Sequence, residues 1–143
     1  MRRTLCLLAA LLALPLLGSD APKGYDGALA EDRIEGEWLR VSQEVDGKEA
    51  GLLLEEKLTF FAGGRFLREM GLHPMTGDYT IDTRSVPPQL DQVVTEGEKK
   101  GRTQKSICRL SADTLKIAST PDGTRPGSFR EKNAVVTTYR RVK

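Results

Sequence analysis

The chain has 143 residues, enough for one ordinary domain, and it carries 22 Lys and Arg against 20 Asp and Glu. Nucleic-acid binding needs a clustered positive surface, whereas this chain mixes both signs of charge throughout, so nucleic acid is excluded as an expected partner. The one local cluster, Lys99-Lys100-Gly101-Arg102, follows Glu96 and Glu98 at a predicted hairpin tip. We interpret it as a solvated loop.

The N-terminus has the pattern of an export signal. Two arginines, Arg2 and Arg3, precede an unbroken apolar run over residues 5–17, and small residues follow at 18–21. We therefore predict a signal peptide over residues 1–19, a flexible lead-in over 20–33 and a folded domain over 34–143, located in the periplasm or outside the cell. The apolar run is too short to span a bilayer as a stable helix, so no stable membrane insertion is expected after the signal is removed.

The number of cysteines limits how the domain can be stabilised. The chain has 2 cysteines, and Cys6 lies within the apolar run of the signal. Removal of the signal peptide would leave Cys108 without a partner for an internal disulfide, so stability must come from the core. Cys108 lies in a strand-like run, and we interpret it as a small buried hydrophobe rather than a nucleophile.

The folded domain is predicted to be all-β. Runs of alternating or β-rich residues, separated by turn residues, indicate strands over 37–45, 55–61, 65–70, 77–83, 89–96, 105–111, 114–119 and 134–142. A short helical turn is predicted over residues 28–35. Mainly sequential antiparallel strands cover their edges most simply by closing, which predicts a single eight-stranded up-and-down antiparallel barrel. A sandwich with Greek-key crossovers is the alternative.

The first strand contains the chain's single tryptophan, Trp38. By strand alternation Arg40 shares the face of Trp38, and Leu39 and Val41 share the other. We expect a twist or bulge to turn Arg40 outward, so that Leu39 and Val41 contribute to the core. In the alternative, Arg40 faces inward beside Trp38 and needs a carboxylate partner or an anionic ligand.

The long irregular segment over residues 121–133 is a second candidate feature. Loops of this length are usually functional or mobile. It contains Phe129, an aromatic residue in polar surroundings. We expect its ring to fill a pocket, either the barrel mouth or the adjacent edge of the core.

No catalytic arrangement is recognisable, and the chain is not expected to be an enzyme. His73 is its single histidine and has neither nearby metal-ligand spacing nor a G-x-S-x-G element to act with. Glu55 and Glu56 are adjacent on a predicted strand and point to opposite faces. No metal or cofactor is therefore predicted.

Gly36-Glu37-Trp38 resembles the G-x-W signature on the first strand of lipocalins and fatty-acid-binding proteins. The resemblance implies that Trp38 closes one end of the barrel and that a basic side chain of the last strand packs over its ring. We choose Arg141 over Arg140 for this role, since Arg141 shares a face with Tyr139. Gly36, Trp38 and Arg141 are thus the predicted closing residues.

The fuller pattern is similar to a small exported lipocalin-like domain of unknown function that is abundant in planctomycete bacteria. The motifs that carry this resemblance follow one another from residue 36 to the C-terminus: Gly36-Glu37-Trp38, Val41-Ser42, Glu44-Val45-Asp46-Gly47-Lys48, Leu58-Thr59-Phe60, Gly77-Asp78-Tyr79, Asp113-Thr114-Leu115-Lys116, Arg125-Pro126-Gly127-Ser128-Phe129 and Arg140-Arg141. The chain departs from the pattern at Arg40 and Cys108, where aliphatic and aromatic residues are more usual. The resemblance implies a fold and a compartment, with no established activity.

Two functions remain open. In the favoured one, the barrel binds a small hydrophobic or amphiphilic ligand, because one Trp, four Phe and three Tyr do not fill an eight-stranded interior completely. The residues predicted to contact it are Trp38, Arg40, Phe60, Phe66, Tyr79 and Phe129. In the alternative, the interior is filled and the outer surface binds an unidentified protein of the cell envelope.

Overall fold

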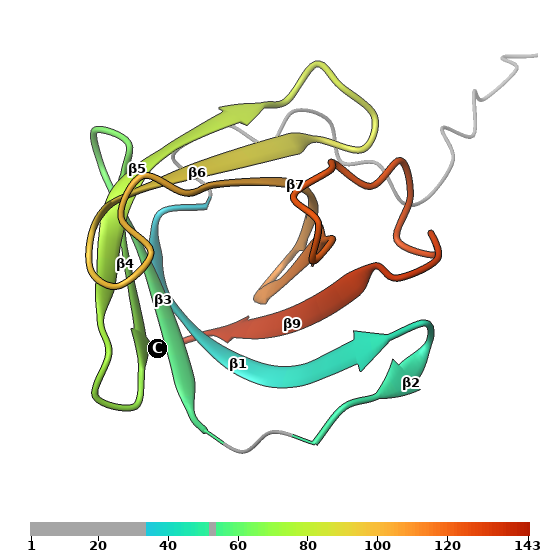
Figure 1. The fold of residues 1–143 in the computed structure, drawn as a ribbon, viewed down its shortest axis with the longest axis horizontal. Coiled ribbons are helices and arrows are strands. Elements are labelled where there is room, and N and C mark those ends of the chain that lie inside the picture. Colours follow the sequence, from blue (N-terminus) through green and yellow to red (C-terminus); the bar gives the residue numbers. More distant parts are fainter. Residues whose placement is uncertain (1–33, 52–53) are drawn as a thin grey trace, which may run out of the picture.

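The computed structural model describes residues 34–51 and 54–143, which form a closed antiparallel β-barrel (Figure 1). Its strands are β1 (Gly36–Val45), β2 (Lys48–Glu49), β3 (Glu56–Phe61), β4 (Arg65–Met70), β5 (Met75–Asp82), β6 (Gln89–Glu96), β7 (Thr103–Ser111), β8 (Thr114–Ser119) and β9 (Val135–Arg141). Successive strands from β3 to β9 pair in chain order, and β1 closes the barrel by pairing with both β3 and β9. The short β2 pairs only with the end of β1.

The all-β class and the closed up-and-down barrel of eight strands, with β2 as an addition, confirm the sequence prediction. The predicted signal peptide, the lead-in and all but the end of the predicted helical turn lie outside the described residues. Within the described part of the chain, no helix is long and apolar enough to cross a membrane.

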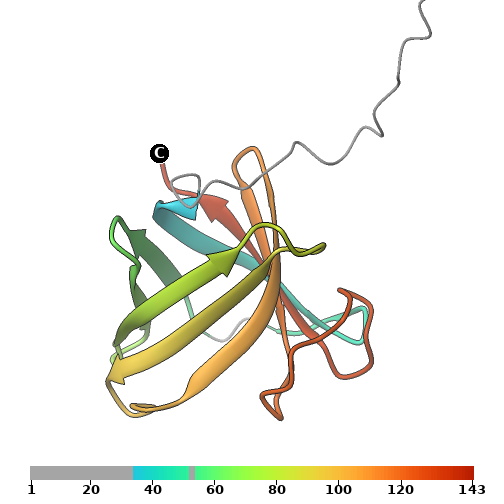
Figure 2. The ribbon, with the colours of Figure 1, turned by 90° about the horizontal axis from the view of Figure 1, so that it is seen from above.

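The two ends of the barrel differ in the connections they carry. Figure 2 shows the C-terminus, the start of β1 and the β7–β8 hairpin at one end. The connections at 97–102 and 120–134 lie at the opposite end. Antiparallel pairing also places the connection at 71–74 at this second end, because it joins β4 to β5. We call the first end the closed end and the second the open end.

Apolar side chains fill the closed end. Trp38 is 0% exposed, and its Nε1 donates a hydrogen bond of 2.8 Å to the carbonyl oxygen of Ile34. Phe60 and Tyr79 meet edge to face, with ring centroids 4.8 Å apart. The buried cluster also includes Leu58, Phe66, Ile81, Leu90, Cys108, Leu115 and Ile117. Burial of these side chains is the main favourable term for folding.

A bulge in β1 decides which side chains face the lumen. The register between β1 and β9 shifts between Arg40 and Ser42. Before the shift, Arg40 lies opposite the buried Tyr139, and after it, Gln43 lies opposite Thr137. The expectation that a bulge turns Arg40 outward is therefore wrong: the bulge is present but follows Arg40, which faces the lumen. Val41, expected in the core, is 41% exposed.

The segment 120–134 folds back over the outer wall of the barrel. Nη2 of Arg125 lies 2.6 Å from Oδ1 of Asp91 on β6, and its Nη1 donates a hydrogen bond of 2.7 Å to the carbonyl oxygen of Ser106 on β7. This cover explains why Ile107 and Ala118 are buried although they alternate with lumen-facing residues.

Candidate functional site

A buried network of charged and polar groups crosses the middle of the lumen. Nη1 of Arg40 donates a hydrogen bond of 2.8 Å to Oε2 of Glu56, and both side chains are only 7% exposed. The hydroxyl of Tyr139 donates to Oε1 of Glu56 at 2.7 Å. Nε of Arg68 lies 3.4 Å from the same oxygen. Two guanidinium groups therefore share one carboxylate.

Strand register assembles this network. Arg40 and Tyr139 are directly opposed on β1 and β9, and Arg68 on β4 lies opposite Leu58 on β3, two residues from Glu56. Each position is an inward one, so the alternation that buries Trp38 also buries these polar groups. Burial raises the pKa of Tyr139 far above its usual range, which keeps its hydroxyl protonated as a donor to Glu56.

On its other side, Arg68 joins a chain of amide side chains. Its Nη1 lies 3.3 Å from Oε1 of Gln104, and its Nη2 lies 3.4 Å from Oε1 of Gln92. Gln92 is 1% exposed. Among the described residues, three buried nitrogens make no hydrogen bond within the protein: Nε of Arg40, Nε of Arg68 and Nε2 of Gln92. All three are donors, so the lumen offers more hydrogen-bond donors than it satisfies.

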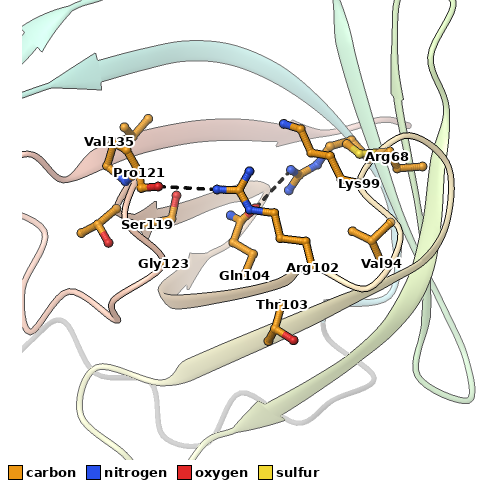
Figure 3. Close-up of a pocket in the computed structure, with 12 residues that line it drawn as sticks. Arg68, Val94, Lys99, Arg102, Thr103, Gln104, Ser119, Pro121, Gly123 and Val135 are labelled. Carbon is orange, nitrogen blue, oxygen red and sulfur yellow. Dashed lines mark hydrogen bonds between the residues drawn. The ribbon is translucent and has the colours of Figure 1, made fainter.

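A cavity of about 170 Å³ opens above Arg68 at the open end of the barrel (Figure 3). Its apolar lining comes from Met75, Val94, Pro121 and Val135. Arg68, Lys99 and Arg102 supply its charged lining, and none of the described residues around it is a carboxylate. Drug-sized ligands occupy pockets of about 300 Å³ or more, so this cavity suits a smaller molecule.

Arg102 extends across the mouth of this cavity. Figure 3 shows its side chain reaching from the β6–β7 connection toward Pro121, whose carbonyl oxygen lies 3.5 Å from Nη2. Lys99 belongs to the same connection, whereas Arg68 approaches from β4. Cations from two separate parts of the chain therefore converge on one small space.

The residues predicted to contact a ligand lie elsewhere. Trp38, Phe60, Phe66 and Tyr79 come together, but they fill the closed end. Arg40 belongs to the network, and none of these five residues lines the cavity. Phe129 lies on the outer wall instead of at the mouth, with the guanidinium carbon of Arg109 5.0 Å from its ring centroid. Phe129 is therefore neither among the residues that line the cavity nor part of the buried apolar cluster.

Sequence reasoning missed the cationic residues of the cavity. Lys99 and Arg102 were interpreted as part of a solvated loop, and Arg68 was not selected. A signal for Arg68 was present, since it lies two residues after Phe66 and therefore on the same face of a strand. For the other two, no local pattern indicates that the hairpin tip lies at the barrel mouth.

The other polar groups considered from the sequence stay apart. His73 is exposed, and its Nδ1 lies 3.5 Å from a carboxylate oxygen of Glu98. Glu55 is exposed whereas Glu56 is buried, as opposite strand faces require. Within residues 34–51 and 54–143, no three His, Cys, Asp or Glu side chains gather as a metal site would need.

The fold and the site define a closed antiparallel β-barrel that is filled at one end and has a small, cation-lined cavity at the other. Comparison of the chain with family models, curated proteins and solved structures finds no match. The resemblance to lipocalin-like domains stays a prediction from the sequence motifs.

Proposed function

We propose that the protein is an exported, non-catalytic binding domain that holds a small amphiphilic molecule in the open half of its barrel. The observation that carries this proposal is the cavity of about 170 Å³, which has an apolar wall and a charged rim within one space. An amphiphile matches both surfaces at once. Export is inferred from the N-terminal sequence pattern alone.

The structure limits where such a ligand can bind. The closed end is occupied by buried apolar side chains, Trp38 and Leu115 among them. The network of Arg40 and Glu56 lies between that core and the cavity. A ligand therefore enters from the open end and stops above Arg68. This favours a short apolar tail over a long chain that threads the whole barrel.

A cavity-filling substitution tests the proposal. Ser119 lines the cavity, whereas Lys116 on the same strand is exposed and points away from the lumen. We expect Ser119→Trp to abolish binding of six-carbon amphiphiles in an NMR titration, and Lys116→Trp to leave it unchanged. Native mass spectrometry of protein purified from its own cell, followed by organic extraction, would identify the natural ligand.

The opposite result would favour the alternative function. If no amphiphile shifts the resonances of cavity residues, and the purified protein carries no extractable molecule, the barrel is a filled module that binds another protein through its outer surface. In that case Ser119→Trp and Lys116→Trp would behave alike.

A further inference from the structure

We infer that the ligand is an organic acid, with a carboxylate or phosphate head group held by Arg68, Lys99 and Arg102. This inference rests on the proposed function and specifies the chemical class of the molecule.

The charges around the cavity do not balance. Arg68, Lys99 and Arg102 line it without an acidic neighbour in the lining. Glu56, the carboxylate that approaches Arg68, also accepts hydrogen bonds from Arg40 and Tyr139. One carboxylate thus serves two guanidinium groups, which leaves an excess positive charge in and beneath the cavity. Lys99 and Arg102 are exposed, whereas the Arg68 side chain is only 16% exposed, so a bound anion would neutralise charge that is poorly solvated at Arg68.

The unsatisfied donors point to the same ligand class. Nε of Arg68 is buried and makes no hydrogen bond, although it lies 3.4 Å from Oε1 of Glu56, and Nε2 of Gln92, which is also buried but does not line the cavity, makes none either. The bonds that hold Arg68 to Gln104 and Gln92 are long, at 3.3 and 3.4 Å. A carboxylate or phosphate only accepts hydrogen bonds when it is fully ionised, so it complements a site that has donors in excess.

Arg102 is placed to complete such a site. The only hydrogen bond that its side chain makes with the described residues joins Nη2 to the carbonyl oxygen of Pro121 at 3.5 Å, the limit of such a bond. An anion at the mouth offers this guanidinium a stronger, charge-assisted partner. Because Pro121 is exposed, water can replace this contact when the side chain turns to the ligand, at little cost to the fold.

Probes matched in their apolar tail isolate the contribution of the head group. We would titrate hexanoate, hexyl phosphate, hexan-1-ol and hexylammonium into the full chain and follow amide resonances by NMR. We expect the two anions to bind at least about tenfold more tightly than hexan-1-ol, and hexylammonium to bind most weakly. Comparison with acetate and inorganic phosphate shows whether the tail is required.

Charge variants then assign the effect to residues. Arg102→Gln should weaken hexanoate binding about two- to fivefold, the range expected for an exposed charge pair, and leave hexan-1-ol unchanged. Lys100→Gln removes the same charge from the same connection, but Lys100 does not line the cavity, so it serves as the control. Raising the salt concentration should weaken hexanoate binding alone.

The outcomes separate this inference from the proposed function. Equal affinity for hexan-1-ol and hexanoate, or tighter binding of hexylammonium, would overturn the assignment of an acid while the binding function stands. Equal losses in Arg102→Gln and Lys100→Gln would also overturn it, since the anion would then sense only the overall charge. If none of the six-carbon probes binds, the proposed function itself fails.

Discussion

The guanidinium carbon of Arg141 lies 4.1 Å from the centroid of the Trp38 ring. The two residues are directly opposed on β1 and β9, and Nη1 of Arg141 also donates a hydrogen bond of 2.6 Å to the carbonyl oxygen of Glu35. The contact expected between Trp38 and the last strand is therefore present. It ties the first strand, the last strand and the residues before the first strand together at the closed end.

Trp38→Ala should destabilise the protein far more than Arg141→Ala. Loss of a buried indole costs about 3–5 kcal/mol, whereas a cation–π contact contributes about 0.5–2 kcal/mol. Urea denaturation followed by circular dichroism measures both, because the far-ultraviolet signal comes mainly from the backbone and reports unfolding of either variant. Arg140→Ala is the matched control, since Arg140 is exposed, and it should change stability by less than about 0.5 kcal/mol. Neutral behaviour of Trp38→Ala would contradict the central role of this residue.

Glu56→Gln should be strongly destabilising, by about 3–5 kcal/mol, because it leaves two guanidinium groups in the lumen without their carboxylate. Its neighbour Glu55 is exposed, so Glu55→Gln should have almost no effect. The free energy of unfolding in urea measures both variants. Adding Arg40→Met to Glu56→Gln should cost less than the sum of the two single changes, since it removes one uncompensated charge. Simple additivity would mean that the ion pair contributes little.

Cys108 should make the protein less stable in alkali. Burial raises the pKa of its thiol to about 12, above its ordinary value of 9.0. As the pH rises, the unfolded chain therefore loses this proton before the folded chain does. The contribution of Cys108 to the free energy of unfolding is complete below about pH 9 and declines as the pH rises toward 12. Between pH 7.5 and 10.5 we expect a loss of about 2 kcal/mol that Cys108→Ala lacks, measured by urea denaturation in a Cys6→Ser background. If the free energies of unfolding of the two proteins had the same pH dependence, burial would not be suppressing ionisation of the Cys108 thiol.

Gly77→Ala should be poorly tolerated. A Cβ atom at this position would lie 1.9 Å from the carbonyl oxygen of Val93 and 2.7 Å from Cε1 of Phe66. Backbone cannot give way as a flexible side chain does, so we expect a loss of about 3 kcal/mol or more, seen as a large fall in Tm. Gly51→Ala is the control, because a Cβ there meets nothing within 4 Å. Equal Tm values for the two variants would show that β5 and β6 can separate locally.

Strand positions could be predicted because alternation is a local signal. Leu58 and Phe60 on β3, and Leu115 and Ile117 on β8, face the core as their spacing indicates. Closure followed from the number and order of the strands. The two-residue β2 is too short to produce a periodic pattern, and its pairing with β1 depends on the turn between them.

The site could be predicted less well, because it depends on contacts between distant residues. Alternation placed Arg40 on the face of Trp38, but the preference for an apolar core favoured turning it outward. What reverses this preference is Glu56, whose carboxylate lies 2.8 Å away in space and on another strand. The positions of Arg102 and Phe129 could not be predicted for the same reason, since the direction in which a loop folds over a barrel produces no periodic pattern in the sequence.

Successive connections lie at alternate ends of the barrel, and some of those at the open end can change without disturbing the core. The connections at 71–74 and 97–102 leave from the open end and are exposed throughout, whereas the connection at 120–134 contains the buried Pro126 and Ala134. Mutation, insertion or grafting in the two exposed connections therefore escapes the constraint of core packing, as it does in binding loops on a rigid framework. Sequence changes can therefore accumulate at these two connections, while substitutions at the tryptophan end are limited by core packing.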